Sequence, residues 1–483
     1  MTKMTNSPKI QITGAPGYIG SHTLTPTTSA NLTHKERVRR RLVRLVFIVY
    51  WLLIFEGALR KWVWPQYSQY LFFVRDPFVL LIYVMALANG MWPRFKPILL
   101  FAYVISSLGL VWIAIQFQVD GADGLKMLLA GYGWRNYFLY IPLAFLIGEQ
   151  FRREDIYRLF RQTLILMIPI AFLVAVQFFS SPNSVINSGI ASEESLQFQG
   201  FRGALGHIRP NGTFTSIAGH THLVVSSICM VFILWILPAK QRPISFAILA
   251  VSAAAAASCL AFSIARGMFI HAGLVAVSSF VAGMALSGRN SRRAMLLPIF
   301  LSMSLVILYP IVFPEALEAF MSRWSEGATS EGRAFGNLGV FGRAFYEVYD
   351  FVRLIDVVPL FGYGMGLAGN AGTTLGASAG GAVPLSIAET DWARHFVDMG
   401  PILAALFILF RVMLTIQLGV QSLQAARRSG NPMSVLLFGY VGVVLFYGQI
   451  SGHGSIGGYA WIFVGLLMAS INLGRSGVKE GVH

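Results

Sequence analysis

Long apolar runs recur along the chain from residue 43 onwards, and each is close to the length of about 20 residues that a helix needs to cross a bilayer. Short polar or basic segments separate most of them. Because a chain in hydrocarbon must satisfy its backbone hydrogen bonds internally, we interpret the runs as membrane-spanning helices. The predicted spans, about 12 in number, are residues 43–59, 70–89, 97–117, 127–148, 162–180, 219–237, 243–262, 268–286, 294–313, 398–418, 433–449 and 456–473.

Composition supports this interpretation and excludes a soluble enzyme domain. Hydrophobic residues make up 55% of the 483 residues and charged residues only 12%, against about 25% charged residues in a soluble domain. We therefore predict an all-α polytopic membrane protein, with one transmembrane domain over residues 43–473. Residues 1–42 are expected to form a disordered basic cytoplasmic tail, and residues 474–483 a short cytoplasmic tail.

The basic residues predict the orientation, because Lys and Arg concentrate on the cytoplasmic side of membrane helices. The clusters that fall on the side of the N-terminus are Arg37 with Arg39, Arg40 and Arg41, then Arg152 with Arg153, Arg289 with Arg292 and Arg293, and Arg427 with Arg428. Both termini are thus expected in the cytoplasm. Basic loops that face an anionic leaflet also account for most of the net charge of +16, and no nucleic-acid-binding module is evident.

Two other features are interpreted as lacking a chemical role. Gly14, Gly17 and Gly20 resemble the phosphate-binding turn that opens nucleotide-sugar epimerases. That turn works between a strand and a helix, whereas a Pro-containing and Thr-rich stretch follows here, so we expect no nucleotide site. Cys229 and Cys259 lie inside apolar spans, which indicates packing residues and neither a disulfide nor a metal site.

Two long segments, residues 181–218 and 314–397, fall outside the membrane in this topology, and loops of such length are usually functional. Within the second, between the ninth and tenth spans, the apolar spacing over Phe341 to Val357 predicts an amphipathic helix on the outer membrane surface. Residues 367–383 are rich in Gly, Ala and Ser. They are interpreted as a mobile flap over a membrane-embedded site, with a plain disordered loop as the alternative.

Charged residues of the outer segments are few and stand next to predicted spans. The candidates are Arg209 before the sixth span, Arg266 in the turn between the seventh and eighth, Arg343 in the amphipathic stretch, and Glu389, Asp391, Arg394 and His395 before the tenth. Glu389 and Asp391 are expected to face the aqueous surface that Arg266 also reaches. Convergent arginines suit a polyanionic ligand, because the guanidinium fork pairs bidentately with phosphate oxygens. The alternative is that each arginine anchors a helix at the membrane interface.

Charges within the predicted spans are interpreted differently. Glu56 and Arg60 are spaced at i and i+4 near the outer end of the first span, and Arg75 and Asp76 lie in the second. Ionisable groups at this depth are costly and suggest function by default. We favour structural ion pairs that tie the two spans together, and Arg135 in the fourth span is interpreted in the same way.

Four motifs, taken in order, resemble those of the O-antigen ligase and Wzy-type polysaccharide polymerase superfamily. They are RPNGTF from Arg209, SIARG from Ser263, PLFGYG from Pro359 after Arg343, and Glu389 placed eleven residues before Gly400. The resemblance covers residues 43–473. It implies a GT-C-like fold in the bacterial inner membrane and a metal-independent, inverting glycosyltransferase without cofactors. The implied substrates are undecaprenyl-pyrophosphate-linked glycans, and a chain-length regulator or export complex is a further expected partner.

The resemblance also implies roles for the candidate residues. Arg266 and Arg209 would hold the pyrophosphate, and Arg343 and Arg394 would orient the glycan. Ligases of this kind carry His-Asn where this chain has Glu389-Thr390, and a carboxylate can serve as the base instead of His. His395 lies nearby, out of register, and is grouped with the substrate-binding residues.

The replacement of that His by Glu389 favours the polymerase over the ligase branch, so polymerisation of repeat units at the periplasmic face is the predicted function. A ligase that transfers glycan to lipid A core or protein remains an alternative. A polysaccharide transporter or flippase is the rival from another class, although no internal repeat of the transporter kind is evident.

Overall fold

The computed structural model describes residues 34–94, 96–121, 123–188, 203–335, 339–369, 372 and 388–480. The regular secondary structure that it describes is helical. Its α-helices are α1 (His34–Ala58), α2 (Ser68–Leu71), α3 (Asp76–Ala88), α4 (Pro97–Asp120), α5 (Gly124–Trp134), α6 (Ile141–Gln150), α7 (Arg153–Phe179), α9 (Ile217–Ile236), α10 (Phe246–Phe262), α11 (Arg266–Ala285), α12 (Gly288–Val312), α13 (Pro314–Phe335), α14 (Gly339–Tyr349), α16 (Asp391–Ser429), α17 (Met433–Tyr447) and α18 (Gly454–Glu480).

Among the described residues, eight helices are long and apolar enough to cross a membrane, which agrees with a polytopic membrane protein. They are α1 with its π-helical extension, α4, α7, α9, α11, α12, α16 and α18. Three further apolar helices, α3, α10 and α17, are shorter. Every predicted span overlaps a helix, but the count of twelve crossings stays a prediction.

The predicted span over residues 127–148 is interrupted. Its two halves, α5 and α6, are separated by a π-helical turn over Arg135–Leu139, and Pro142 stands in the first turn of α6. Proline has no backbone N–H, so the second half begins anew after this turn. A similar break divides α16 at Gly400, which has φ of 69° and precedes Pro401. Gly400 lies so close to the carbonyl of Leu360 that a Cβ would overlap it.

The ion pairs expected between the first spans are confirmed. Glu56 lies 3.3 Å from Arg60 and 2.9 Å from Arg75. Arg135 donates to both carboxylate oxygens of Asp76, at 2.7 and 2.9 Å. All five side chains are buried. These charges therefore connect α1, the start of α3 and the π-helical turn before α6, as buried charges require partners.

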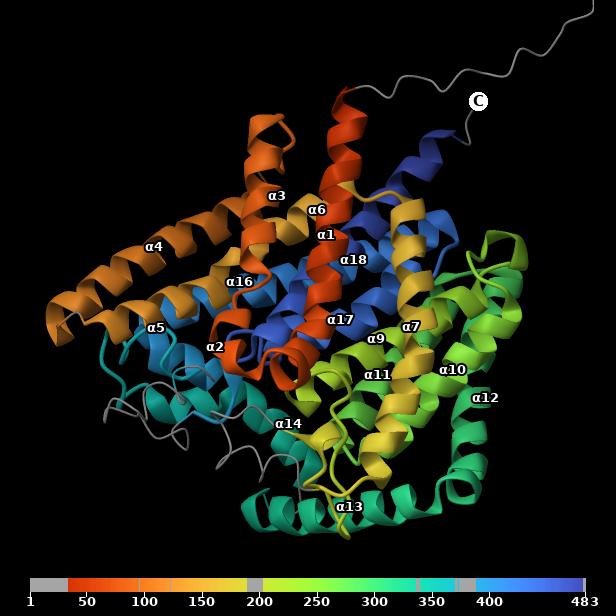
Figure 1. The fold of residues 1–483 in the computed structure, drawn as a ribbon. Coiled ribbons are helices and arrows are strands. Elements are labelled where there is room, and N and C mark those ends of the chain that lie inside the picture. The colour runs from red at the N-terminus through yellow and green to blue at the C-terminus, as the bar shows by residue number, and fades with distance from the viewer. Residues whose placement is uncertain are drawn as a thin grey trace, which may run out of the picture.

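The centre of the bundle is α18, which packs against α6, α16, α17 and α9 (Figure 1). The outer helices α4 and α12 present many large apolar side chains outward, such as Leu100 and Val111 on α4 and Val306 and Ile311 on α12. Soluble proteins rarely expose such continuous apolar surface. These faces therefore fit contact with lipid.

The segment after α12 differs from the prediction, which placed a helix only over Phe341 to Val357. Two helices lie here, α13 and α14, and a 3₁₀ turn over Asp350–Leu354 follows α14. Both helices lie across one end of the bundle, opposite the start of α1 and the end of α18 (Figure 1). We call this the α13 end. Most of the Gly-rich stretch over residues 367–383, interpreted as a flap, lies outside the described residues.

The boundaries of both tails also need correction. Residues 34–42, expected in the disordered tail, form the first turns of α1, and residues 474–480 continue α18. Acidic and basic partners explain the early start, since Glu36 pairs with Arg39 and Arg40 at i+3 and i+4. The glycine motif of the N-terminal tail lies outside the described residues.

Candidate functional site

A cavity of about 1340 Å³ lies at the α13 end of the bundle. Its walls come from the start of α11, the second half of α13, α14 and the C-terminal end of α17. Four of the six predicted site residues line it, namely Arg209, Arg266, Arg343 and Glu389. The fold therefore brings together side chains that are up to 180 positions apart in the sequence (389 − 209).

Arg266 is the first residue of α11 and enters the cavity from a tight turn. The turn is formed by Ile264, whose φ is 49°, and by Ser263, whose hydroxyl accepts a hydrogen bond from the N–H of Ala265. The guanidinium group of Arg266 donates to both carboxylate oxygens of Glu331 on α13, at 3.0 and 3.1 Å. This bidentate pair fixes the plane of the guanidinium group.

Arg209 is held near the cavity by the residues that follow it. Gly212 accepts a hydrogen bond from Lys61 at its carbonyl, at 3.0 Å, and donates from its N–H to Gln177, at 2.8 Å. Thr213 donates to the carbonyl of Ile54. The RPNGTF motif is thereby anchored to α1 and α7, and Gly212 has the positive φ of 57° that favours glycine.

Electrostatic repulsion acts on Arg209. Burial and, to a lesser extent, the nearby positive charge of Arg323 on α13 lower the pKa of Arg209 below its ordinary value. Two guanidinium groups that line the same cavity close to each other favour the binding of an anion, since the anion relieves the repulsion.

A second cluster of an arginine and carboxylates, besides Arg266 with Glu331, lies on the α14 side of the cavity. Arg343 is 3.3 Å from Glu389 and 3.4 Å from Glu347, so one guanidinium group contacts two carboxylates. The side chain of Glu389 is 51% exposed, which leaves it accessible to a ligand. Burial raises the pKa of Glu347 above its ordinary value of 4.5, although the charge of Arg343 lowers it.

Arg394 and His395 do not line this cavity, contrary to the prediction. His395 is fully buried. Arg411 can only donate, so its Nη1, 2.8 Å away, makes Nε2 of His395 the acceptor. The opposite ring nitrogen, Nδ1, lies 3.2 Å from the hydroxyl of Tyr137. Arg394 is 9% exposed and donates to the carbonyl of Ala388.

Asp391 was also expected at the aqueous surface beside Glu389, and this is wrong. It is fully buried, 2.6 Å from Arg411, and accepts a hydrogen bond from Ser451 at 2.7 Å. Asp391 and His395 are four residues apart on α16 and therefore share a helix face. That face meets the protein interior, where Arg411, later in the same helix, supplies the opposite charge.

Several cavity residues were not predicted from the sequence. Arg323, Trp324 and Glu331 lie on α13, and Glu347 lies on α14. The signal for α13 is present in the sequence, because Pro314 starts the helix and the apolar residues Leu317, Phe320 and Trp324 follow at helical spacing. Glu331, the ion-pair partner of Arg266, lies on this helix, so a prediction without α13 could not include that pair.

The cavity has the chemistry to bind a phosphate-containing ligand. Four arginines and four carboxylates line it, and the carboxylates compete with any anion for the guanidinium groups: Arg209, Arg266, Arg323 and Arg343, with Glu326, Glu331, Glu347 and Glu389. No group of three or more His, Cys, Asp or Glu residues that could hold a metal ion occurs in the part of the chain that the structure describes.

Comparison with known proteins adds no further assignment. No protein-family model matches the chain, and no curated protein matches its sequence.

Proposed function

We propose that the protein is a membrane glycosyltransferase that polymerises oligosaccharide repeat units linked to undecaprenyl pyrophosphate, at the periplasmic face of the bacterial inner membrane. The observation that carries the proposal is the meeting of Arg209, Arg266, Arg343 and Glu389 at one cavity of about 1340 Å³. A cavity of this size is larger than the typical small-molecule site of about 300 to 1,000 Å³. It suits a pyrophosphate together with sugars.

In this proposal the pyrophosphate of the donor binds to Arg266 and Arg209. Phosphate oxygens present the same bidentate geometry as the carboxylate of Glu331, which lies 3.0 Å from Arg266. The donor thus replaces Glu331 as the partner of Arg266. As the bond between the anomeric carbon and the pyrophosphate breaks, both guanidinium groups stabilise the negative charge that develops on the leaving group.

Glu389 acts as the general base. The hydroxyl oxygen of the acceptor sugar attacks the anomeric carbon, its proton passes to Glu389, and the undecaprenyl pyrophosphate leaves from the opposite side, which inverts the configuration. Arg343, 3.3 Å from Glu389, orients the carboxylate for this transfer. The half-exposed position of Glu389 allows an acceptor hydroxyl to approach it.

A ligase would use the same donor and the same arginines, and it differs only in the acceptor. The Glu389-Thr390 pair, which stands where similar ligases have His-Asn, favours the polymerase. A transporter would bind the pyrophosphate without needing a base, so the effect of Glu389 separates it from both enzymes.

The test is an assay of the purified full-length protein in lipid nanodiscs with lipid-linked repeat units as the only substrate. Arg266→Ala and Glu389→Ala should each reduce polymer formation by about 10²-fold or more, the usual effect of losing a group that acts in the transition state. Arg333→Ala and Glu318→Ala are the matched controls, because both residues are exposed on α13 and do not line the cavity.

The outcomes separate the three functions. Polymer formed from the repeat units alone, and lost in both cavity variants, supports the polymerase. A product that appears only when lipid A core is added indicates the ligase. Full activity of both cavity variants contradicts the proposed site, and movement of repeat units across liposomes without any new glycosidic bond indicates a transporter.

A further inference from the structure

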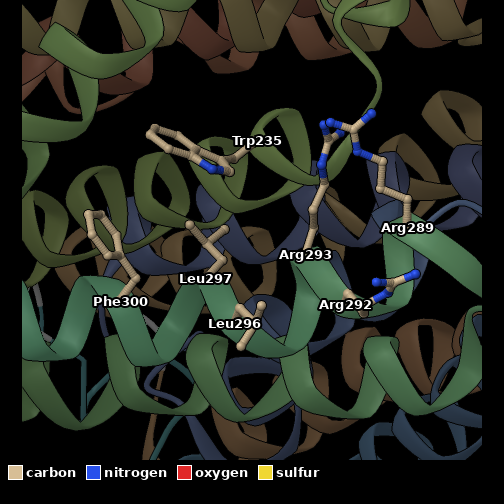
Figure 2. A pocket seen from close by; sticks show the side chains of 7 residues that line it. All are labelled: Trp235, Arg289, Arg292, Arg293, Leu296, Leu297 and Phe300. Atoms are coloured by element: carbon tan, nitrogen blue, oxygen red, sulfur yellow. The ribbon is translucent and has the colours of Figure 1, made fainter.

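A second cavity, of about 530 Å³, lies at the opposite end of the bundle from the candidate site. α11 starts at Arg266 in the first cavity and ends at Ala285, just before the second. Its 20 residues separate the two by about 30 Å, at about 1.5 Å per residue. The residues that line the second cavity are Trp235, Arg289, Arg292, Arg293, Leu296, Leu297 and Phe300 (Figure 2).

The polar part of this cavity is basic, and its described lining contains no acidic residue. Arg289, Arg292 and Arg293 come from the first turns of α12, and the side chains of Arg289 and Arg293 extend to the same side in Figure 2. The chain has no Asp or Glu from residue 195 to residue 314. Within the described ranges, Arg289 and Arg292 take part in no ion pair.

A neighbouring arginine adds to the positive charge. Arg242, in the connection between α9 and α10, donates to the carbonyl of Trp235 at 2.8 Å. Arg293 donates to the carbonyl of Ile236 at 3.3 Å. Burial and the charge of Arg293 lower the pKa of Arg242, so the two guanidinium groups repel each other. An anion placed between these residues would relieve that repulsion.

The other part of the cavity is apolar and continues along the outside of α12. Leu296 and Phe300 are each 62% exposed, and at a spacing of four residues they lie on one face of the helix. In Figure 2 Phe300 lies on the side away from the arginines, and Trp235 lies between Phe300 and Arg293. A ligand that satisfies the whole site therefore needs an anionic head and an apolar chain.

We propose that this cavity binds an anionic phospholipid. The lipid phosphate contacts Arg289, Arg292 and Arg293, and an acyl chain lies along Leu296 and Phe300. Trp235 stands between the two parts, as amphipathic aromatic rings do at membrane interfaces. In the predicted orientation the site faces the cytoplasmic leaflet, which is the leaflet that attracts basic segments. The inference does not depend on the glycosyltransferase proposal, because the two cavities share no residues.

The experiment measures lipid retention on the purified full-length protein by native mass spectrometry, with phosphatidylglycerol and phosphatidylcholine as probes. The wild-type protein should retain phosphatidylglycerol preferentially. The double variant R289Q/R292Q should lose about tenfold or more in affinity for it, because each basic residue near an anionic lipid contributes about 1 kcal/mol. The control R427Q/R428Q removes another exposed basic pair, at the end of α16, and should retain the preference.

A second variant separates a lipid from a free anion. Phe300→Ala should weaken the retention of phosphatidylglycerol and leave the binding of inorganic phosphate unchanged. Equal retention of both lipids by the wild-type protein overturns the proposal, as does an equal loss in the control pair. Full displacement of phosphatidylglycerol by inorganic phosphate at the same concentration overturns the lipid assignment. Phe300→Ala also tests the site independently if the arginine variant fails to fold.

Discussion

Arg266 is held from two sides, by Glu331 and by Gly327, both on α13. The carboxylate of Glu331 pairs with both terminal nitrogens of the guanidinium group. Gly327 lies so close to that group that a Cβ would overlap it. The position of Arg266, which we propose binds the pyrophosphate, thus depends on the absence of a side chain at Gly327. Gly327 lies one helical turn before Glu331, the ion-pair partner of Arg266.

Gly327→Ala should reduce the glycosyltransferase activity by about 10²-fold, because a displacement of about 1 Å at a catalytic group has an effect of that size. Gly332→Ala is the matched control, since a Cβ at Gly332 meets nothing within 4 Å. Both variants gain in helix propensity, so their unfolding temperatures should not fall. Equal activities of the two variants would show that the position of Arg266 does not matter.

Glu347 should make the stability of the protein depend on pH. Burial raises its pKa above the ordinary 4.5, so the folded protein binds this proton more tightly than the unfolded chain. Stability from this group is present below pH 4.5 and is lost as the pH rises through the folded pKa. Thermal unfolding in detergent, followed from about pH 4 to about pH 7, should show a smaller decrease for Glu347→Gln than for the wild-type protein.

The exposed Glu318 provides the control for that measurement, because Glu318→Gln removes a carboxyl of the neighbouring helix without changing the cavity. An unchanged pH dependence in Glu347→Gln would mean that another group is responsible.

The chain around the start of α16 contains a residue of the cavity and, directly after it, polar residues of the protein interior. Glu389, just before the helix, lines the cavity, whereas Asp391 and His395 face inward to Arg411. A chain of polar contacts runs from Arg411 through His395 and Tyr137 to Asp398, whose carboxylate accepts from Tyr137 at 2.9 Å. This chain joins α16 to the π-helical turn before α6.

Asp391→Asn should therefore destabilise the fold and leave substrate affinity unchanged. It removes the opposite charge from the buried Arg411, and breaking a buried pair in this way costs about 3 to 5 kcal/mol. The measurements are the yield of folded protein, its unfolding temperature and the KM of the surviving fraction. Asp356→Asn, at an exposed position, is the control. Normal stability with a raised KM would place Asp391 in the substrate site.

For the whole molecule, the two proposals together require the two ends of the bundle to face opposite sides of the membrane. Ser325 on α13 and Ser287 before α12 are both exposed and lie at these two ends. Ser325→Cys should react with a membrane-impermeant maleimide in cells with a permeable outer membrane, whereas Ser287→Cys should react only after lysis. Cys229 and Cys259 are buried and provide an unreactive background.

The reverse labelling pattern would place the α13 end in the cytoplasm. It would contradict catalysis at the periplasmic face and would move the proposed lipid site to the other leaflet.

The location of the site could be predicted only in part. Arg209 and Arg266 stand beside apolar spans in short motifs, so their place at a helix end follows from the local sequence. Arg394 and His395 have the same kind of setting, yet α16 turns them inward. Position along the chain shows how close a residue is to a helix end. It does not show which face of that helix meets the interior.

The membrane class and the helical segments follow from the amino-acid sequence. A segment in the hydrocarbon core needs apolar side chains and must form its backbone hydrogen bonds internally. Each segment meets these two conditions by itself, so they can be recognised in runs such as residues 162–180 and 219–237. The tertiary structure alone decided that α13 places Glu331 against Arg266, and that Arg411 draws Asp391 and His395 into the core. Arg266 and Glu331 are 65 positions apart in the sequence, and Asp391 and Arg411 are 20 positions apart. These ion pairs depend on which helix faces pack against each other, and a local sequence pattern does not predict that packing.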